Sequence, residues 1–102
     1  MTISFTDNKE LPQMKQYRKF KNKFPSAMLL FRWGDFYETY EEDARTIASI
    51  LGITLTRRGD THMAAFPHYA LDIYLPKLVR AGYRVAICDP IDESQPIEKT
   101  RS

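Results

Sequence analysis

Cysteine and long apolar runs are scarce in this sequence. Its 102 residues include one cysteine, Cys88, which excludes an internal disulfide and a zinc site made of four thiolates. Cys88 ends the short apolar run 85–88 and is expected to be a buried strand thiol. No apolar run approaches the roughly 20 residues that span a bilayer, and residues 1–10 are too polar for a secretory signal. These absences predict a cytoplasmic protein with no membrane contact.

Motifs for nucleotide hydrolysis and metal binding are also missing. No Gly-x-x-x-x-Gly-Lys-Ser/Thr phosphate loop occurs, so we expect no ATP site. His62 and His68 lie six residues apart with no thiol nearby, which does not favour a metal site. Metal-dependent nucleases use acidic residues, and Asp35, Glu38 and Asp43 are candidates of that type. No lysine accompanies them in a recognisable metal-nuclease pattern, however. The sequence therefore predicts neither an enzyme nor a bound cofactor.

The charges are nearly balanced but unevenly placed. The net charge is only +2, which does not by itself indicate a nucleic-acid-binding protein. Between residues 9 and 23 Glu10 is the one acid among six basic residues, whereas all the charges between residues 35 and 43 are acidic. Such a distribution can orient a domain on a polyanion, and a solvated helix face is the alternative explanation. Lys15 and Lys19 are the candidate phosphate contacts in the basic segment.

Length and composition predict one small globular domain. Apolar residues make up 43% of the chain and aromatic residues 13%, which is typical of a folded protein. We expect residues 1–10 to form a flexible arm, residues 11–93 to form the domain, and residues 94–102 to form a flexible tail. Pro90 and Pro96 bracket the polar stretch that leads into this tail.

Two helices are predicted in the first half of the chain. The first begins at Pro12, a favoured first-turn residue, and ends before Pro25. The second begins at a capping box formed by Thr39 and Glu42, and Gly52 ends it. Their apolar faces, at three- and four-residue spacing, comprise Met14, Tyr17, Phe20 and Phe24 in the first helix and Ala44, Ile47, Ala48 and Leu51 in the second.

A third helix and several strands follow from the same patterns. The helix opens after Pro67 and ends at Gly82, and its apolar face comprises Leu71, Tyr74, Leu75, Leu78 and Val79. Short apolar or alternating runs predict strands over residues 27–31, 36–40, 53–56, 63–66 and 84–88. Tight turns are expected at residues 33–35, where Gly34 can take a positive φ, and at residues 57–60. Strands that alternate with helices predict an α/β fold in two or three layers.

Four blocks of the sequence, in this order and at this spacing, match a known family. They are Phe31 to Asp43 (which includes Gly-Asp-Phe-Tyr-Glu), Leu51 to Gly59, Met63-Ala-Ala-Phe-Pro67, and Tyr74 to Cys88. Together they resemble the N-terminal mismatch-recognition domain of the MutS family of DNA repair proteins. The resemblance spans about residues 11 to 93, nearly the whole chain.

This resemblance implies both a fold and a function. The fold is an α/β domain with a mixed β-sheet packed by about three helices. In the family, a Phe-x-Glu motif enters the minor groove at a mispair, and here that motif is Phe36-Tyr37-Glu38. The expected partner is therefore mismatched or distorted duplex DNA. The ATPase and clamp regions of the family have no counterpart in this sequence, so we expect a bacterial, single-domain DNA-binding module.

The sequence departs from the family pattern in three places. Ala65 stands where the family usually has glycine, so the local turn is expected to differ if the backbone there needs a positive φ. Trp33 stands where methionine is usual and either adds stacking beside the motif or fills a gap in the core. Asp89-Pro90 changes how the chain leaves the last predicted strand.

The spacing of Phe36 and Glu38 suits a contact with one base step. Residues two apart on an extended strand project from the same face, with Cα atoms roughly 6 to 7 Å apart. An inserted phenylalanine unstacks a base step, which costs least at a mispair, and stacking returns about 1–3 kcal/mol. Glu38 can accept a hydrogen bond from an unpaired base or repel correctly paired DNA.

Alternatives remain for each of these residues. Phe36 could belong to the core and Glu38 could be a solvated strand residue, whereas Tyr37 alternates to the other face and is expected in the core. Arg57 and Arg58 follow a predicted strand and could contact phosphate or face solvent. A protein-interaction module that docks on another DNA repair or mobile-element protein is the alternative function, since the net charge is close to neutral.

Overall fold

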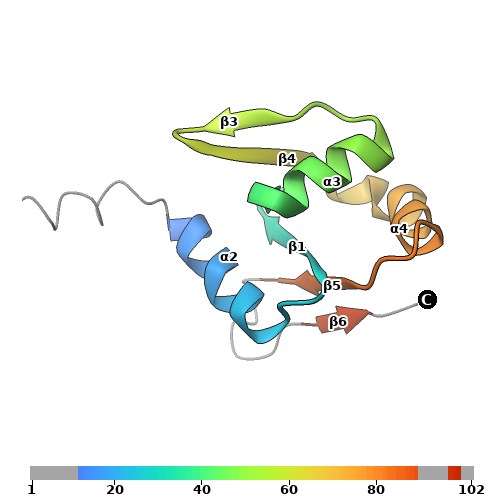
Figure 1. Ribbon diagram of the computed structural model, residues 1–102, viewed down its shortest axis with the longest axis horizontal. Coiled ribbons are helices and arrows are strands. Elements are labelled where there is room, and N and C mark those ends of the chain that lie inside the picture. Colours follow the sequence, from blue (N-terminus) through green and yellow to red (C-terminus); the bar gives the residue numbers. More distant parts are fainter. Residues whose placement is uncertain (1–11, 90–96, 100–102) are drawn as a thin grey trace, which may run out of the picture.

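A computed structural model describes residues 12–89 and 97–99 of the chain (Figure 1). Six strands form one sheet in the order β3-β4-β2-β1-β5-β6. The strands are β1 (Met28–Trp33), β2 (Phe36–Tyr40), β3 (Thr56–Arg58), β4 (Thr61–Pro67), β5 (Val85–Cys88) and β6 (Ile97–Lys99). The helices are α2 (Pro12–Lys23), α3 (Glu41–Leu51) and α4 (Leu71–Arg80), with the short 3₁₀ helix η1 (His68–Ala70) before α4.

The sheet is mixed, as the family resemblance implied. β1 runs parallel to β5, while the pairs β1–β2, β2–β4, β3–β4 and β5–β6 are antiparallel. Figure 1 shows the β3–β4 hairpin along one edge of the domain and β5 with β6 at the opposite edge. β1 and β2 therefore occupy the middle of the sheet, where both of their edges are paired.

The helices cover the two faces of the sheet, so the domain has three layers. On one face, α2 packs against a core that includes Leu29 and Phe31 of β1. On the other face, α3 and α4 pack against a core that includes Met28 and Leu30 of the same strand. All four residues are buried, which confirms that this apolar run is a central strand covered on both sides.

The predicted faces of α2 and α3 and the predicted turn at Gly34 are confirmed, whereas Leu78 is the one fully buried residue of the face predicted for α4. Met14, Tyr17 and Phe20 of α2 are buried, and the buried residues of α3 are the four that the periodicity predicted. Gly52 ends α3 in the left-handed conformation with φ 72°. Gly34, between β1 and β2, has φ 63°, as the predicted turn required.

The predicted capping box at the start of α3 is wrong. The helix begins after Tyr40, and no side chain caps its first turn. Thr39 is a buried residue of β2, and its hydroxyl lies 3.3 Å from the hydroxyl of Tyr17 on α2. The tertiary contact with α2 therefore replaces the local bond to the helix backbone that the sequence pattern favoured.

The strand predicted over residues 53–56 is displaced toward the C-terminus. Residues 53–55 are irregular, and β3 begins at Thr56 and includes Arg57 and Arg58, which had been assigned to a turn. The turn is confined to Gly59 and Asp60, so the hairpin is tighter than predicted. Because arginines do not alternate with apolar residues here, the periodicity carried no strand signal.

A sixth strand was not predicted. Ile97–Lys99 pair antiparallel with β5, although they lie in the segment 94–102 that was expected to be a tail. The expected arm at residues 1–10 lies outside the described residues. Within the described part of the chain, no helix combines the length and apolar character that crossing a membrane demands.

One carboxylate joins three elements of the fold. Asp43, in the first turn of α3, accepts hydrogen bonds from the Tyr17 hydroxyl at 2.7 Å and from the Lys21 ammonium at 2.9 Å. It also accepts the backbone N–H of Leu29 on β1 at 3.2 Å. Burial and the neighbouring Asp43 charge raise the pKa of Tyr17 above its usual value, so its hydroxyl remains a donor. These bonds hold α2 against the sheet.

The variant Asp43→Ala should therefore lose stability. Removing the carboxylate leaves the N–H of Leu29 without its acceptor and takes from the buried Tyr17 hydroxyl its shortest hydrogen bond, and we expect a loss of about 2–3 kcal/mol in the free energy of unfolding. The neighbouring exposed residue gives the control, because Glu42→Ala should cost less than about 1 kcal/mol through the helix dipole alone. Urea unfolding of the three proteins measures both changes. Equal stability of Asp43→Ala and the parent would contradict the role given to Asp43.

Candidate nucleic-acid interface

Phe36 lies in a row of exposed or half-buried side chains at one end of the sheet. It pairs with Trp33 on β1 and with Pro67 on β4, so all three project from the same face. Phe36 is 47% exposed and Trp33 is 37% exposed. Trp33 also stacks on the buried ring of Phe31, with centroids 5.9 Å apart. An aromatic pair therefore stands on two neighbouring strands and remains open to a ligand.

The next residue on this face, Glu38, is not solvated. It is 5% exposed and lies between Phe31 of β1 and Ala65 of β4 in the ladder. The Tyr40 hydroxyl donates a hydrogen bond to Oε1 of its carboxylate. Nη2 of Arg58 lies 3.6 Å from Oε2. The structure thus brings Glu38 together with Phe36, as expected from the two-residue spacing, but gives its carboxylate two internal partners.

Tyr37 projects to the opposite face, as strand alternation predicted. Its ring lies 5.8 Å from that of Phe66 and packs against the core beneath α3 and α4. The guanidinium of Arg32 lies over the same ring, 5.8 Å from its centroid. Tyr37 therefore belongs to the core beneath α3 and α4, whereas Phe36 and Glu38 lie on the opposite face of the sheet.

Arg57 and Arg58 point to different faces of the sheet. Arg58 is on the face of Phe36, where it meets Glu38. Arg57 pairs with His62, whose ring nitrogen lies 3.4 Å from Arg45 of α3 on the opposite face. The structure therefore brings only one of these two arginines beside the motif.

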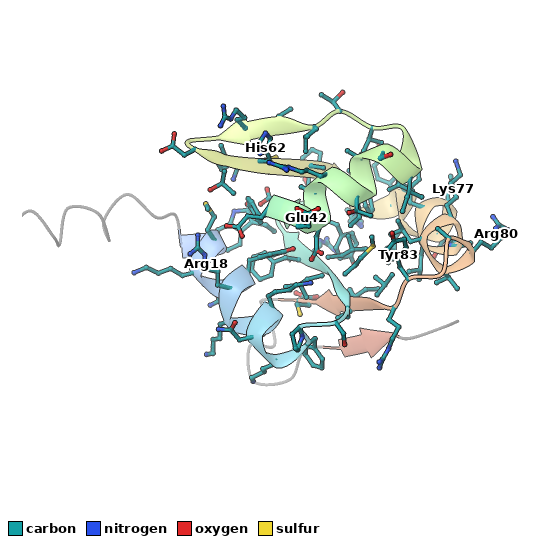
Figure 2. All side chains as sticks on the ribbon, viewed as in Figure 1. Arg18, Glu42, His62, Lys77, Arg80 and Tyr83 are labelled. Carbon is teal, nitrogen blue, oxygen red and sulfur yellow. The ribbon has the colours of Figure 1, made fainter. Side chains whose placement is uncertain are left out.

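Lys15 and Lys19 are exposed on the outer side of α2, four residues apart. The helix packs on the same face of the sheet that carries Phe36 and Glu38. Lys21 from the same basic segment is used internally, since it bonds to Asp43 and to the carbonyl oxygen of Ala27. Arg18, labelled in Figure 2, forms an ion pair with Glu41 at 3.3 Å.

The acids considered for a metal-dependent nuclease lie in separate places. Asp43 lies beneath α2, Glu38 lies beside Tyr40 and Arg58, and Asp35 is in the turn between β1 and β2. Among residues 12–89 and 97–99, no group of three histidine, cysteine or acidic side chains is placed to hold a metal ion. Cys88 is buried, as expected for a strand thiol.

Tyr40 is a residue of this region that was not predicted from the sequence. The alternation along β2 places it on the face of Phe36 and Glu38, and that spacing was the available signal. Its ring fits the apolar pattern of a strand, so Tyr40 was counted only as a strand residue. No motif in the neighbouring sequence indicated that its hydroxyl would meet a carboxylate.

Comparison with known proteins agrees with this architecture. A family model described as MutS domain I matches residues 11–101. Among the curated relatives, the DNA mismatch repair protein MutS of Porphyromonas gingivalis is 60% identical over 89 residues, and that of Flavobacterium johnsoniae is 58% identical over 90 residues. These alignments cover 82% and 83% of this chain. The chain belongs to the MutS domain I family.

The relatives are much longer proteins. The alignments cover 10% of the Porphyromonas gingivalis and Flavobacterium johnsoniae proteins, and 11% of the MutS protein of Flavobacterium psychrophilum, which is 54% identical over 96 residues. The chain therefore spans about a tenth of the length of these relatives, and the part that it matches is one domain.

One departure from the MutS domain I pattern has no effect on the backbone. Ala65 lies within β4, directly opposite Glu38, and the described non-glycine residue with a positive φ is Glu41. The backbone at Ala65 is therefore ordinary strand, and its methyl group carries none of the strain considered from the sequence.

Exposure of Phe36 predicts that the MutS domain I fold does not depend on its ring. Phe36→Ala should lower the free energy of unfolding by about 1 kcal/mol or less, as for an exposed substitution. Phe31→Ala, which removes a fully buried ring on the same face, should cost about 3–5 kcal/mol. Thermal and urea unfolding of both variants give the comparison. A loss at Phe36 as large as that at Phe31 would show that Phe36 is a core residue.

Proposed function

We propose that this chain binds mismatched or otherwise distorted duplex DNA and inserts Phe36 into the minor groove at the distorted step. The observation that carries the proposal is the exposure of Phe36 on an open sheet face, with Glu38 beside it on the same strand. Membership of the MutS domain I family supports it, because the relatives are named DNA mismatch repair proteins.

The chemistry of Phe36 suits a preference for weakened base steps. Insertion of the ring partly unstacks the step and bends the duplex toward the major groove. Unstacking costs a few kcal/mol, and least where the bases are mispaired, while base–aromatic stacking returns about 1–3 kcal/mol. The balance is favourable where the duplex is already weakened. Trp33, next to Phe36 in the ladder, adds a second exposed aromatic surface at the same place.

Basic side chains on the same side of the domain would hold the phosphates. Lys15 and Lys19 are exposed on α2, and the side chain of Arg58 on β3 is 35% exposed. We place these three residues at the phosphate contacts. Arg57 projects from the other face and would contribute only through its charge at longer range.

Binding should be weak, salt-dependent and selective for a mispair. A module of this size buries only about 600–1,000 Å² on DNA, and contacts from a few cations weaken as salt rises. Phe36→Ala should remove about 1–3 kcal/mol of binding to mismatched duplex and most of the difference between mismatched and matched duplex. Gel shifts or fluorescence anisotropy at low and physiological salt measure these effects. Equal affinity of the parent protein for the two duplexes would overturn the proposed function.

Glu38→Gln should change selectivity in a different way. Glutamine keeps the shape and an acceptor oxygen but removes the charge that phosphates repel. We expect tighter binding to matched duplex, by a few-fold, and a smaller ratio of the two affinities. The same titrations measure it, with Glu42→Gln as a control on an exposed acid of α3. A loss of affinity for both duplexes would contradict this role of the charge.

A second candidate function is that of a protein-interaction module whose partner is another DNA repair or mobile-element protein. It is favoured by one observation, the exposure of Tyr69 (77%) and Ile73 (63%) on η1 and α4, on the side of the sheet away from Phe36. Tyr69→Ala and Ile73→Ala should leave DNA binding unchanged if DNA is held at the Phe36 face. Loss of DNA binding in these variants would move the interface to α4.

A further inference from the structure

The environment of Glu38 presents a physical problem for a DNA-binding surface. Glu38 is buried, with 5% of the residue exposed, and lies two residues from the exposed ring that we propose to enter the minor groove. A buried charge without a partner is costly, and the phosphates of DNA would raise that cost further. Whatever neutralises and orients this carboxylate therefore affects how closely Phe36 can approach DNA.

Arg58 supplies the opposite charge. Its Nη2 lies 3.6 Å from Oε2 of Glu38, a distance for an ion pair and too long for a good hydrogen bond. The side chain of Glu38 is 7% exposed, whereas that of Arg58 is 35% exposed. Arg58 thus compensates the buried charge from the solvent side while part of its guanidinium remains accessible.

Tyr40 supplies the directional contact. Its hydroxyl donates to Oε1 of Glu38, while its ring is 2% exposed and meets Tyr17 of α2 edge-on, with centroids 5.1 Å apart. Burial raises the pKa of Tyr40, the hydrogen bond to Glu38 raises it further, and Arg58 opposes the shift. The hydroxyl therefore stays protonated, and its ring cannot move away because it is packed under α2.

We propose that Tyr40 is a positioning residue for Glu38 and that Arg58 is its counter-charge, so that Phe36 and a neutralised, oriented Glu38 meet DNA as one preformed unit. This inference rests on the proposed function and adds to it two residues that act through Glu38. Tyr40 fixes where the carboxylate points, and Arg58 lowers the repulsion between that carboxylate and the phosphates.

The variant Tyr40→Phe tests the orienting contact, because it keeps the ring and removes the hydroxyl. We expect the ratio of the matched to the mismatched dissociation constant to fall about five- to tenfold, the size of effect expected for the loss of one ordinary hydrogen bond. Tyr83→Phe is the matched control, since Tyr83 is 40% exposed and lies beside α4, away from α2 (Figure 2). It should leave the ratio unchanged.

A double variant separates positioning from a general structural role. In a Glu38→Ala background, Tyr40→Phe should cause no further change in the ratio, because the group it positions is gone. A purely structural role would instead weaken binding to both duplexes by the same factor in both backgrounds. Melting curves of each variant, measured under the titration conditions, check that every variant is folded when its binding is compared with that of the parent protein.

Arg58→Gln tests the counter-charge and does not depend on Tyr40. It should weaken binding to both duplexes about tenfold at low salt, and adding Glu38→Gln should restore the part of that loss that comes from the uncompensated carboxylate, leaving only the loss of the phosphate contact. A direct phosphate contact alone would leave the double variant as weak as the single one, which would overturn the role of Arg58. Arg80→Gln on α4, far from Arg18 and α2 in Figure 2, is the control for loss of one positive charge.

The outcomes distinguish the two proposals. If the parent protein shows no preference for mismatched duplex, the proposed function fails and this inference falls with it. If the parent shows the preference and Tyr40→Phe keeps the full ratio, the inference about Tyr40 is overturned and the proposed function stands. A reduced ratio in Tyr40→Phe that disappears in the Glu38→Ala background supports both.

Discussion

The position of α2 on the sheet depends on the carboxylate of Asp43. This group binds Tyr17 and Lys21 of α2 and the backbone of Leu29 on β1, and it belongs to the first turn of α3. With these bonds in place, α2 covers the end of β2 that carries Tyr40. The other end, with Phe36, stays open to solvent. The proposed DNA-contacting surface therefore exists because the covering helix is held over only part of the sheet.

Alternation along β2 then divides the motif between two tasks. Tyr37 joins the core beneath α3 and α4, while Phe36, Glu38 and Tyr40 follow one another along the opposite face. Along this face the exposed fraction falls from 47% to 5% to 2%. The buried end of β2 can thus hold Glu38 in place beside the exposed ring of Phe36. Pre-organised groups of this kind lose little conformational entropy on binding.

The sequence predicted what depends on local periodicity, and missed what depends on contacts between distant segments. The faces of α2 and α3 and the turn at Gly34 follow from spacing and backbone freedom, and they agree with the structure. Thr39 was assigned to a helix cap because its alternative partner, Tyr17, is 22 residues away. The pairing of Arg58 with Glu38 was missed for the same reason, because the two residues are 20 positions apart in the sequence. The shared face of Phe36 and Glu38 was predictable, but the burial of Glu38 was not.

The central claim, that Phe36 enters a weakened base step, can be tested with a probe that the chain already contains. Trp33 is the sole tryptophan, is 37% exposed, and is paired with Phe36 across the sheet. Its fluorescence should therefore respond when a duplex reaches Phe36. With equal concentrations of two duplexes that differ only in one mispair, at low salt, we predict a larger change in Trp33 emission with the mismatched duplex. Identical titration curves for the two duplexes, or binding that leaves Trp33 emission unchanged, would contradict the account.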